Sequence, residues 1–96
     1  MDLTDRDIED WLLEKLVRHH NWTHRYVARR DALKYLPKNI LRTADRAIDS
    51  LLREGLLGSY KKGDCIYLVP SRRAEILYRS DAFKEKVYGK QLPLLG

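Results

Sequence analysis

The sequence predicts a mainly α-helical domain with one small β-hairpin. Three observations support this fold class. Apolar residues recur at helical spacing in several segments, a proline and a glycine flank the longest central one, and a glycine-containing polar turn joins two β-rich runs after it. The 96 residues are the length of one domain. We expect the domain to cover residues 1–88 and a C-terminal tail to cover residues 89–96.

The first predicted helix runs from about Thr4 to His20. Thr4 is a favourable N-cap, and Asp7, three residues later, can complete a capping box with it. The apolar residues that follow fall on one helix face: Ile8, Trp11, Leu12, Leu16 and Val17. A polar connection follows, and Tyr26 and Val27 are expected to form a short strand.

A short second helix, a tight turn and a longer third helix are expected next. The second helix is predicted over 28–36, and Pro37 ends it because a residue before proline disfavours helical geometry. The turn covers 37–39 and the third helix 40–54. Gly55 is expected to end the third helix, since glycine readily adopts the left-handed conformation found at helix C-termini.

A hairpin and a last helix complete the pattern. The polar turn Lys61–Asp64 joins the two β-rich runs, so we expect residues 56–69 to form the hairpin. Ser71 can cap a fourth helix that extends to about Tyr88. Ser80–Asp81 is the place where a break in that helix would fall.

A short helix, a tight turn, a longer helix and an immediate hairpin make up the winged helix-turn-helix plan, with a three-helix core, a wing and a C-terminal helix. One hairpin can also belong to a small α+β fold of another kind. The proline turn in Leu36–Arg42 and the Glu-Gly-Leu corner in Ala47–Leu57 resemble small archaeal winged helix-turn-helix proteins, over about residues 25–80. The resemblance implies the fold and favours DNA-binding transcription regulators, although a fold alone does not define a function.

Charge is unevenly distributed along the chain. The formal net charge is +5, but the first 17 residues carry six acidic and two basic side chains, and the remainder carries eight acidic and seventeen basic ones. A basic surface prefers polyanions. We therefore expect the first helix to be excluded from a polyanion interface and the rest of the domain to supply it.

The outward face of the third helix holds the main candidate contacts. Arginine can pair with guanine or bind phosphate, and asparagine can pair with adenine. The alternative interpretation is a solvated face, because Asp49 can pair with Arg46 and Arg53, and Asp45 and Asp49 would repel phosphates. The predicted nucleic-acid contacts are Lys38, Asn39, Arg42, Thr43, Arg46 and Arg53 on or near this helix, Lys61 and Lys62 at the hairpin tip, and Arg29 and Arg30 at the start of the second helix.

Double-stranded DNA binding, with residues 40–54 in the major groove and residues 56–69 as the wing, is therefore the leading hypothesis, and transcription regulation its expected role. The alternative is a protein-interaction module that uses the C-terminal helix and tail. Its partner-binding residues would be Phe83, Val87, Tyr88 and Leu92, and the same surface could form a homodimer. RNA binding is a third option, but the sequence shows no paired surface aromatics of the kind that stack on bases.

Other classes of function lack signals in the sequence. No glycine-rich phosphate loop, nucleophile motif or paired-carboxylate arrangement indicates an enzyme, a cofactor or a small-molecule substrate. The single Cys65 cannot form an internal disulfide or a cysteine-based zinc finger, and His19, His20 and His24 are expected to be solvated or stacked rather than metal ligands. No apolar run approaches membrane-spanning length and the N-terminus is too acidic for a signal peptide, so a cytoplasmic location is expected.

Overall fold

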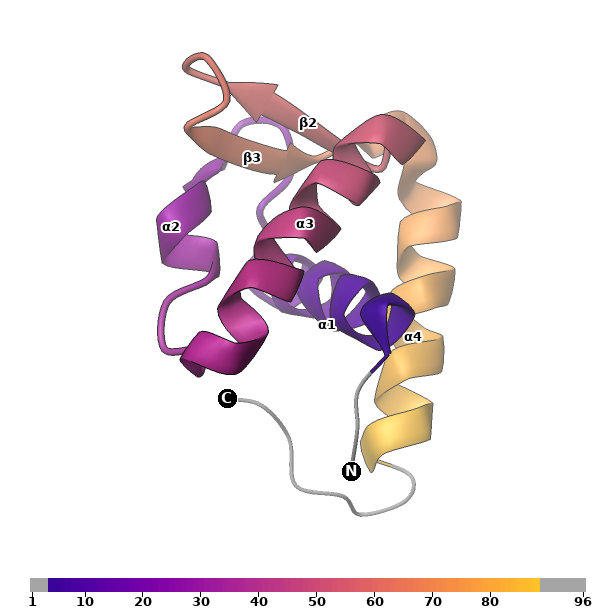
Figure 1. Cartoon of the computed structure of the whole chain (residues 1–96). Helices are drawn as coiled ribbons and strands as arrows, with labels where there is room; N and C mark the ends of the chain where they lie inside the picture. The colour runs from indigo at the N-terminus through magenta and orange to yellow at the C-terminus, as the bar shows by residue number, and fades with distance from the viewer. Residues whose placement is uncertain (1–3, 89–96) are drawn as a thin grey trace.

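The computed structural model describes residues 4–88, so the predicted tail at 89–96 lies outside the described residues. This part of the chain is mainly helical and contains a small three-stranded antiparallel sheet, as Figure 1 shows. Its elements, in chain order, are α1 (Asp5–Arg18), β1 (Val27–Ala28), α2 (Arg29–Ala32), α3 (Lys38–Glu54), β2 (Leu57–Tyr60), β3 (Cys65–Leu68), the 3-10 turn η1 (Pro70–Arg72) and α4 (Arg73–Tyr88).

The core lies where α1, α3, α4 and the sheet meet. In Figure 1, α1 runs behind α3, α4 stands along one side, and the hairpin of the sheet lies at the top of the view. The helices α1, α3 and α4 and the central strand β3 contribute fully buried apolar side chains, among them Leu12 and Leu13, Ile48 and Leu51, Ile66 and Leu68, and Ile76. Burial of this apolar surface is the main force that holds the helices and the sheet together.

The predicted start of α1 is confirmed. The Thr4 hydroxyl accepts a hydrogen bond of 3.0 Å from the Asp7 backbone N–H, and the Asp7 carboxylate accepts one of 3.1 Å from the Thr4 N–H. These two bonds form the expected capping box, which satisfies backbone donors that a helix N-terminus otherwise leaves free. The helix ends at Arg18, with His19 as its C-cap.

The prediction for the second helix and the following turn was wrong in its boundaries. The helix α2 ends at Ala32 instead of residue 36, and the turn occupies 33–36 instead of 37–39. The cause is Tyr35, whose backbone φ of 73° lies in the left-handed region and reverses the chain before Pro37. Pro37 is then the N-cap of α3, which begins two residues earlier than predicted, at Lys38.

The hairpin and the glycine that precedes it are confirmed. Gly55 ends α3 with a left-handed φ of 80°, and β2 pairs with β3 in antiparallel register. The short strand predicted at Tyr26 and Val27 forms one residue later, as β1, and pairs with the other edge of β3. The strand order is therefore β1-β3-β2, with β3 in the centre.

One detail predicted for α4, its N-cap, was wrong, and the possible break in the helix does not occur. Ser71 lies within η1 and does not cap α4, which begins at Arg73. The helix also continues without a break through Ser80–Asp81. Ile76 and Ser80 are both almost completely buried, so packing on the core favours an uninterrupted helix through the polar pair. None of the described helices is long and apolar enough to cross a membrane.

Phe83 and Val87 require a further correction. Both were expected on an exposed partner surface, but they are only 5% and 3% exposed and belong to the core. The reason is that α4 directs its apolar face toward α1, with which it makes the most extensive helix–helix contact. Tyr88 ends α4, and Leu92 lies outside the described residues. The predicted partner surface therefore loses its two best-defined apolar residues.

Candidate functional site

The helix α3 presents a polar face to solvent along its N-terminal half. Its opposite face packs into the core through the buried residues Ala44, Ala47, Ile48 and Leu51. The helix period then places the predicted contacts Lys38, Asn39, Arg42 and Arg46 outside, and all four are exposed. Thr43 is half-buried at the flank, and Arg53 is exposed near the C-terminal end. The structure thus brings most of the predicted α3 contacts onto one surface.

Arg29 binds the two acidic side chains of α3 that could oppose an anionic ligand. Its guanidinium lies 2.8 Å from the Asp45 carboxylate and 2.9 Å from the Asp49 carboxylate, and it also donates to the Asp45 carbonyl oxygen at 2.8 Å. Burial opposes the charge, but the hydrogen bonds to Asp45 and Asp49 outweigh it and raise the pKa of Arg29. Arg29, predicted as a direct contact, therefore uses its donors within the protein.

The cations of this side stand without acidic partners. Within residues 4–88, no carboxylate lies at ion-pair distance from the side chains of Arg30, Lys34, Lys38, Arg42, Arg46, Arg53, Lys61 or Lys62. All eight of these residues are exposed. Like charges held together on one surface raise its positive potential, and an anion that binds there relieves their repulsion.

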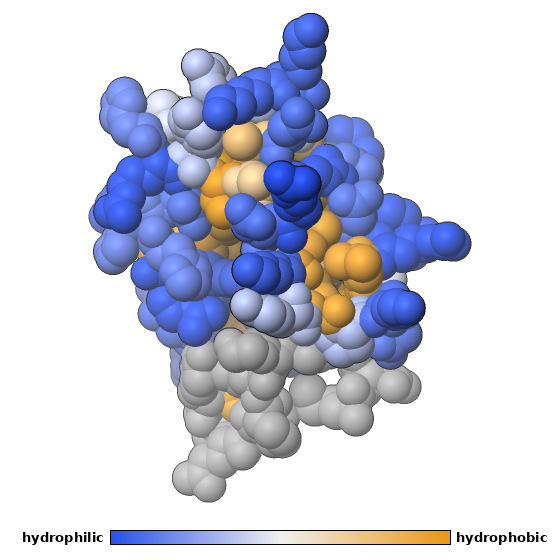
Figure 2. Space-filling model, turned by 90° about the vertical axis from the view of Figure 1, so that its left-hand side faces the viewer, coloured by the Kyte–Doolittle hydropathy of each residue, from blue (hydrophilic) through white to orange (hydrophobic). Residues whose placement is uncertain are grey.

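An open groove of about 1220 Å³ connects α2, the turn before α3, the first half of α3 and the hairpin tip. Figure 2 views the molecule from this side and shows an apolar patch bordered by hydrophilic side chains. The apolar lining includes Leu33, Leu36 and Leu41. The basic lining residues are Arg29, Arg30, Lys34, Lys38, Arg42 and Lys61, against the two acids Asp45 and Asp64. The groove is therefore predominantly basic.

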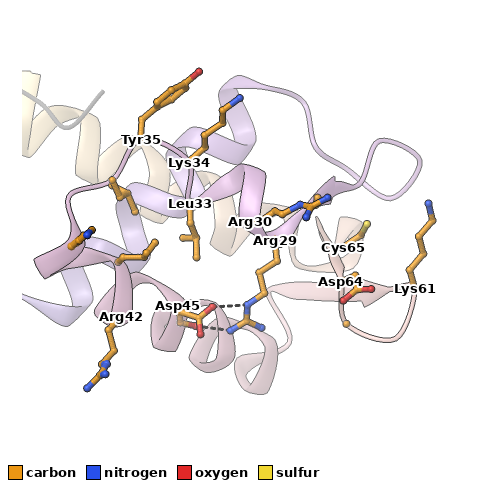
Figure 3. A pocket seen from close by; sticks show the side chains of 15 residues that line it. Arg29, Arg30, Leu33, Lys34, Tyr35, Arg42, Asp45, Lys61, Asp64 and Cys65 are labelled. Atoms are coloured by element: carbon orange, nitrogen blue, oxygen red, sulfur yellow. Dashed lines mark hydrogen bonds and ion pairs between the residues drawn. The ribbon is translucent and has the colours of Figure 1, made fainter.

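The side chains around the groove point in two directions. In Figure 3, Lys34, Tyr35 and Lys61 extend to one side, and Arg42 extends to the opposite side from α3. Lys34, which falls within the predicted second helix, was not among the predicted contacts. The turn at Tyr35, which is 90% exposed, instead brings Lys34 to the rim of the groove.

The hairpin tip has a backbone conformation that holds both of its lysines outward. Lys61, Lys62 and Gly63 have φ values of 54°, 57° and 90°, and the Asp64 N–H donates back to the Lys61 carbonyl at 3.1 Å. Non-glycine residues adopt such values only rarely. Both predicted lysine contacts are exposed, and Lys61 also lines the groove.

A smaller cavity of about 610 Å³ lies on the far side of α2, against the C-terminal half of α1. Its most deeply placed cation is Lys15, whose ammonium donates to the Ala32 carbonyl at 2.9 Å. Burial lowers the pKa of Lys15. This amine therefore links α1 to the end of α2.

Neither a metal site within residues 4–88 nor a known relative identifies the ligand of this protein. Among the described residues, no group of three potential ligands could hold a metal ion, and Cys65 is a free, buried thiol. Comparison of the chain with protein-family models, curated proteins and solved structures finds no match. The chemistry of the α3 face and the groove is therefore the guide to the ligand.

Proposed function

We propose that this protein is a winged helix-turn-helix protein that binds double-stranded DNA, with α3 in the major groove and the β2–β3 hairpin as the wing. The observation that supports the proposal best is the row Lys38, Arg42 and Arg46 on the exposed face of α3, without acidic partners among the described residues. These residues follow one another at intervals of four, so each lies about one helical turn from the next.

The dimensions of α3 suit a major groove. An α-helix with its side chains is about 10–12 Å wide and the major groove of B-DNA about 12 Å, so one helix can enter. Helix-turn-helix proteins insert the N-terminal part of this helix, which here holds Asn39 and Arg42. Both side chains are exposed there. Arg42 could pair with guanine and Asn39 with adenine, and Lys38 and Arg46 would contact phosphates.

The groove and the hairpin extend this surface. The element order α2, turn, α3, hairpin agrees with the winged helix-turn-helix plan. Lys61 and Lys62 at the hairpin tip could contact the DNA backbone beside α3, and Arg30 could do so from α2. Arg29 supports binding indirectly, because its ion pairs with Asp45 and Asp49 reduce the repulsion that these carboxylates would exert on phosphates.

Fluorescence anisotropy with a labelled duplex tests the proposal. We expect binding at low salt that weakens steeply as salt is added, because bound counterions are released from the DNA. The double variant Arg42→Ala/Arg46→Ala should lose about tenfold or more in affinity, since each lost charge-assisted contact is worth roughly 1–3 kcal/mol. Because Arg46 is the one of the two that would contact phosphate, the slope of log affinity against log salt should also become shallower by about one.

A matched control removes the same charge elsewhere. Arg6→Ala/Lys84→Ala also deletes two positive charges, from exposed positions in α1 and α4. It should leave the affinity within about twofold, because charges separated by more than a Debye length of about 8–10 Å are largely screened at physiological salt. Absence of duplex binding at low salt, or an equal loss in the control, would refute the proposal.

A role in transcription regulation is the part of the proposal that requires sequence specificity. Selection of bound duplexes from a random pool tests it directly. A regulator should enrich one motif, and Asn39→Ala should relax the preference at one position of that motif by roughly 1–3 kcal/mol. A pool that stays random after repeated selection would restrict the protein to non-specific duplex binding.

A further inference from the structure

The outer face of the sheet carries an aromatic pair next to basic side chains. The rings of Tyr26 and Tyr60 lie 4.9 Å apart between centroids, and the two side chains are 41% and 53% exposed. The Lys61 ammonium lies 5.4 Å from the centre of the Tyr26 ring. The sequence showed no such pair, because the two tyrosines are 34 positions apart and meet only through the sheet.

The register of the strands explains why these rings share a face. Tyr60 lies opposite Cys65, and Ala28 lies opposite Cys65 on the other edge. Directly opposed residues point to the same side of a sheet, and alternation along the chain puts Tyr26 on the side of Ala28. Tyr67 shares this face as the partner of Gly58, and a Cβ built at Gly58 would lie only 2.3 Å from its ring. The face is therefore tyrosine-rich.

The tyrosine-rich face adjoins a row of cations. Lys61 borders both the Tyr26 ring and the groove. From there, Figure 3 shows Arg30 extending toward the hairpin, with Lys34 and Tyr35 beyond it on the same side of the groove as Lys61. The Lys34 ammonium lies 5.1 Å from the centre of the Tyr35 ring. Three cations therefore lie between the Tyr26–Tyr60 pair and Tyr35, away from the side on which Arg42 extends.

We infer that this edge binds unpaired nucleotides of a nucleic-acid strand, by stacking bases on Tyr26 and Tyr60 and placing phosphates against Lys61, Arg30 and Lys34. A paired base offers only its edges to a protein, whereas an unpaired base exposes the flat face that an aromatic ring can cover. The cations without acidic partners match the charge of the strand backbone. This site shares Lys61 and Arg30 with the proposed duplex surface, but its stacking residues Tyr26 and Tyr60 are not among the proposed duplex contacts.

Binding of labelled oligothymidylate and oligouridylate, measured by anisotropy at low salt, tests the site. We expect the wild-type protein to bind at least one of them, and the pair of probes distinguishes a DNA strand from an RNA strand. Tyr26→Ala/Tyr60→Ala should weaken binding at least tenfold, because stacking on one aromatic ring contributes roughly 5- to 150-fold in affinity. Tyr26→Phe/Tyr60→Phe retains both rings and should stay within about twofold of the wild type.

Two controls separate stacking from general damage. Tyr78→Ala removes a 75% exposed tyrosine from α4 and should leave binding unchanged. Photo-crosslinking of the wild-type protein to an oligonucleotide that contains 5-iodouracil should place the adduct on Tyr26 or Tyr60, a result that is independent of how stable the alanine variants are. No binding of either probe, equal loss in Tyr78→Ala, or adducts confined to other residues would overturn the inference.

The outcome is distinguishable from that of the duplex experiment. Arg42→Ala/Arg46→Ala should reduce duplex affinity but leave oligothymidylate binding within about twofold. If the protein does not bind the duplex but binds a single strand through the two tyrosines, the single-strand site is supported and the duplex proposal is rejected. If Arg42→Ala/Arg46→Ala abolishes the binding of both ligands while the double tyrosine variant binds both normally, the edge is not a separate site.

Discussion

The layer formed by α1 and α4 uses its charges differently from the side formed by α2, α3 and the hairpin. Between α1 and α4, cations are enclosed by acids: Arg79, only 3% exposed, lies 2.7 Å from Asp10 and 3.2 Å from Glu9. On the α2–α3–hairpin side, the exposed cations lack carboxylate partners within residues 4–88. Paired charges hold elements together, whereas unpaired charges remain available to a ligand.

Arg29 is an exception to this division between paired and unpaired charges. It lies on the α2–α3–hairpin side, yet it is paired with Asp45 and Asp49 like a residue of the α1–α4 layer. The solvated-face interpretation offered Asp49 as a partner of Arg46 and Arg53, but in the described residues Asp49 pairs with Arg29 and with neither of these arginines. Substitutions in the α1–α4 layer should therefore lower the stability of the fold most. Substitution of Arg29 should lower both stability and DNA affinity, and substitution of the unpaired cations should lower DNA affinity alone.

The largest expected effect on stability is at Arg79. Arg79→Ala leaves Glu9, Asp10 and Glu54 without their shared partner, and removal of one member of a buried ion pair costs about 3–5 kcal/mol. Urea denaturation followed by circular dichroism measures the change. Arg6→Ala is the matched control, because Arg6 contacts the same Asp10 at 3.6 Å but is 62% exposed, and it should cost about 0.5 kcal/mol or less. An equal loss of unfolding free energy in both variants would show that burial does not strengthen the ion pairs of Arg79.

The next effect is at Arg29, where stability and binding should change together. Arg29→Ala should cost about 1–2 kcal/mol, since hydrogen bonds between charged groups contribute about 1.5–3 kcal/mol and both carboxylates are half exposed. It should also weaken duplex binding severalfold, because Asp45 and Asp49 would then face the phosphates.

A compensated variant separates the two roles of Arg29. In Arg29→Ala/Asp45→Asn/Asp49→Asn the repelling charges are absent, so duplex affinity should return to within about twofold of the wild type. Affinity that stays low in this triple variant, in the anisotropy assay, would mean that Arg29 contacts DNA directly.

A third effect is the pH dependence contributed by Asp7 and Lys86. The hydrogen bond of 2.7 Å from Lys86 is the main cause that holds the pKa of Asp7 below its ordinary value of 3.8, and the Thr4 cap adds to it. A carboxyl whose pKa is lower in the folded state stabilises the fold above pH 4, and this contribution disappears as the pH falls below the ordinary value. Lys86→Ala should therefore cost about 1 kcal/mol at pH 7 and less near pH 3.

Urea titrations at the two pH values measure this difference. Lys84→Ala is the control, because Lys84 is only 3.8 Å from Asp81, which is 74% exposed, and such a surface pair contributes little. A loss in Lys86→Ala that is the same at both pH values would assign the effect to side-chain packing and not to the ionised Asp7.

The features that the sequence predicted correctly depend on residues close in the chain. Thr4 and Asp7 form a capping box three residues apart, and Gly55 ends α3 through its own backbone conformation. The hairpin turn at 61–64 is local as well. For the candidate site, the helix period sufficed to put Arg42 and Arg46 outside once α3 was recognised, even though its start was misplaced.

The features that were missed depend on contacts between distant residues. Arg29 meets Asp45 and Asp49 across 16 and 20 positions, and Tyr26 meets Tyr60 across the sheet. Which face of α4 turns inward was set by α1, so Phe83 could not be placed from its own neighbours. The left-handed Tyr35 is a local feature, but non-glycine residues adopt this conformation too rarely to be expected without a specific signal.

The smallest expected change in stability is at the unpaired cations, which contrast directly with the paired cations of the α1–α4 layer. Arg42→Ala/Arg46→Ala removes two exposed side chains that make no ion pair among the described residues, so its free energy of unfolding should stay within about 0.5 kcal/mol of the wild type. The same loss of two charges in the α1–α4 layer, by Arg79→Ala/Lys86→Ala, should cost several kcal/mol. Like-charge repulsion on the α3 face can even make the first variant slightly more stable. Urea denaturation of both variants in one buffer tests the contrast, and a loss above about 1 kcal/mol in Arg42→Ala/Arg46→Ala would mean that these arginines also support the fold.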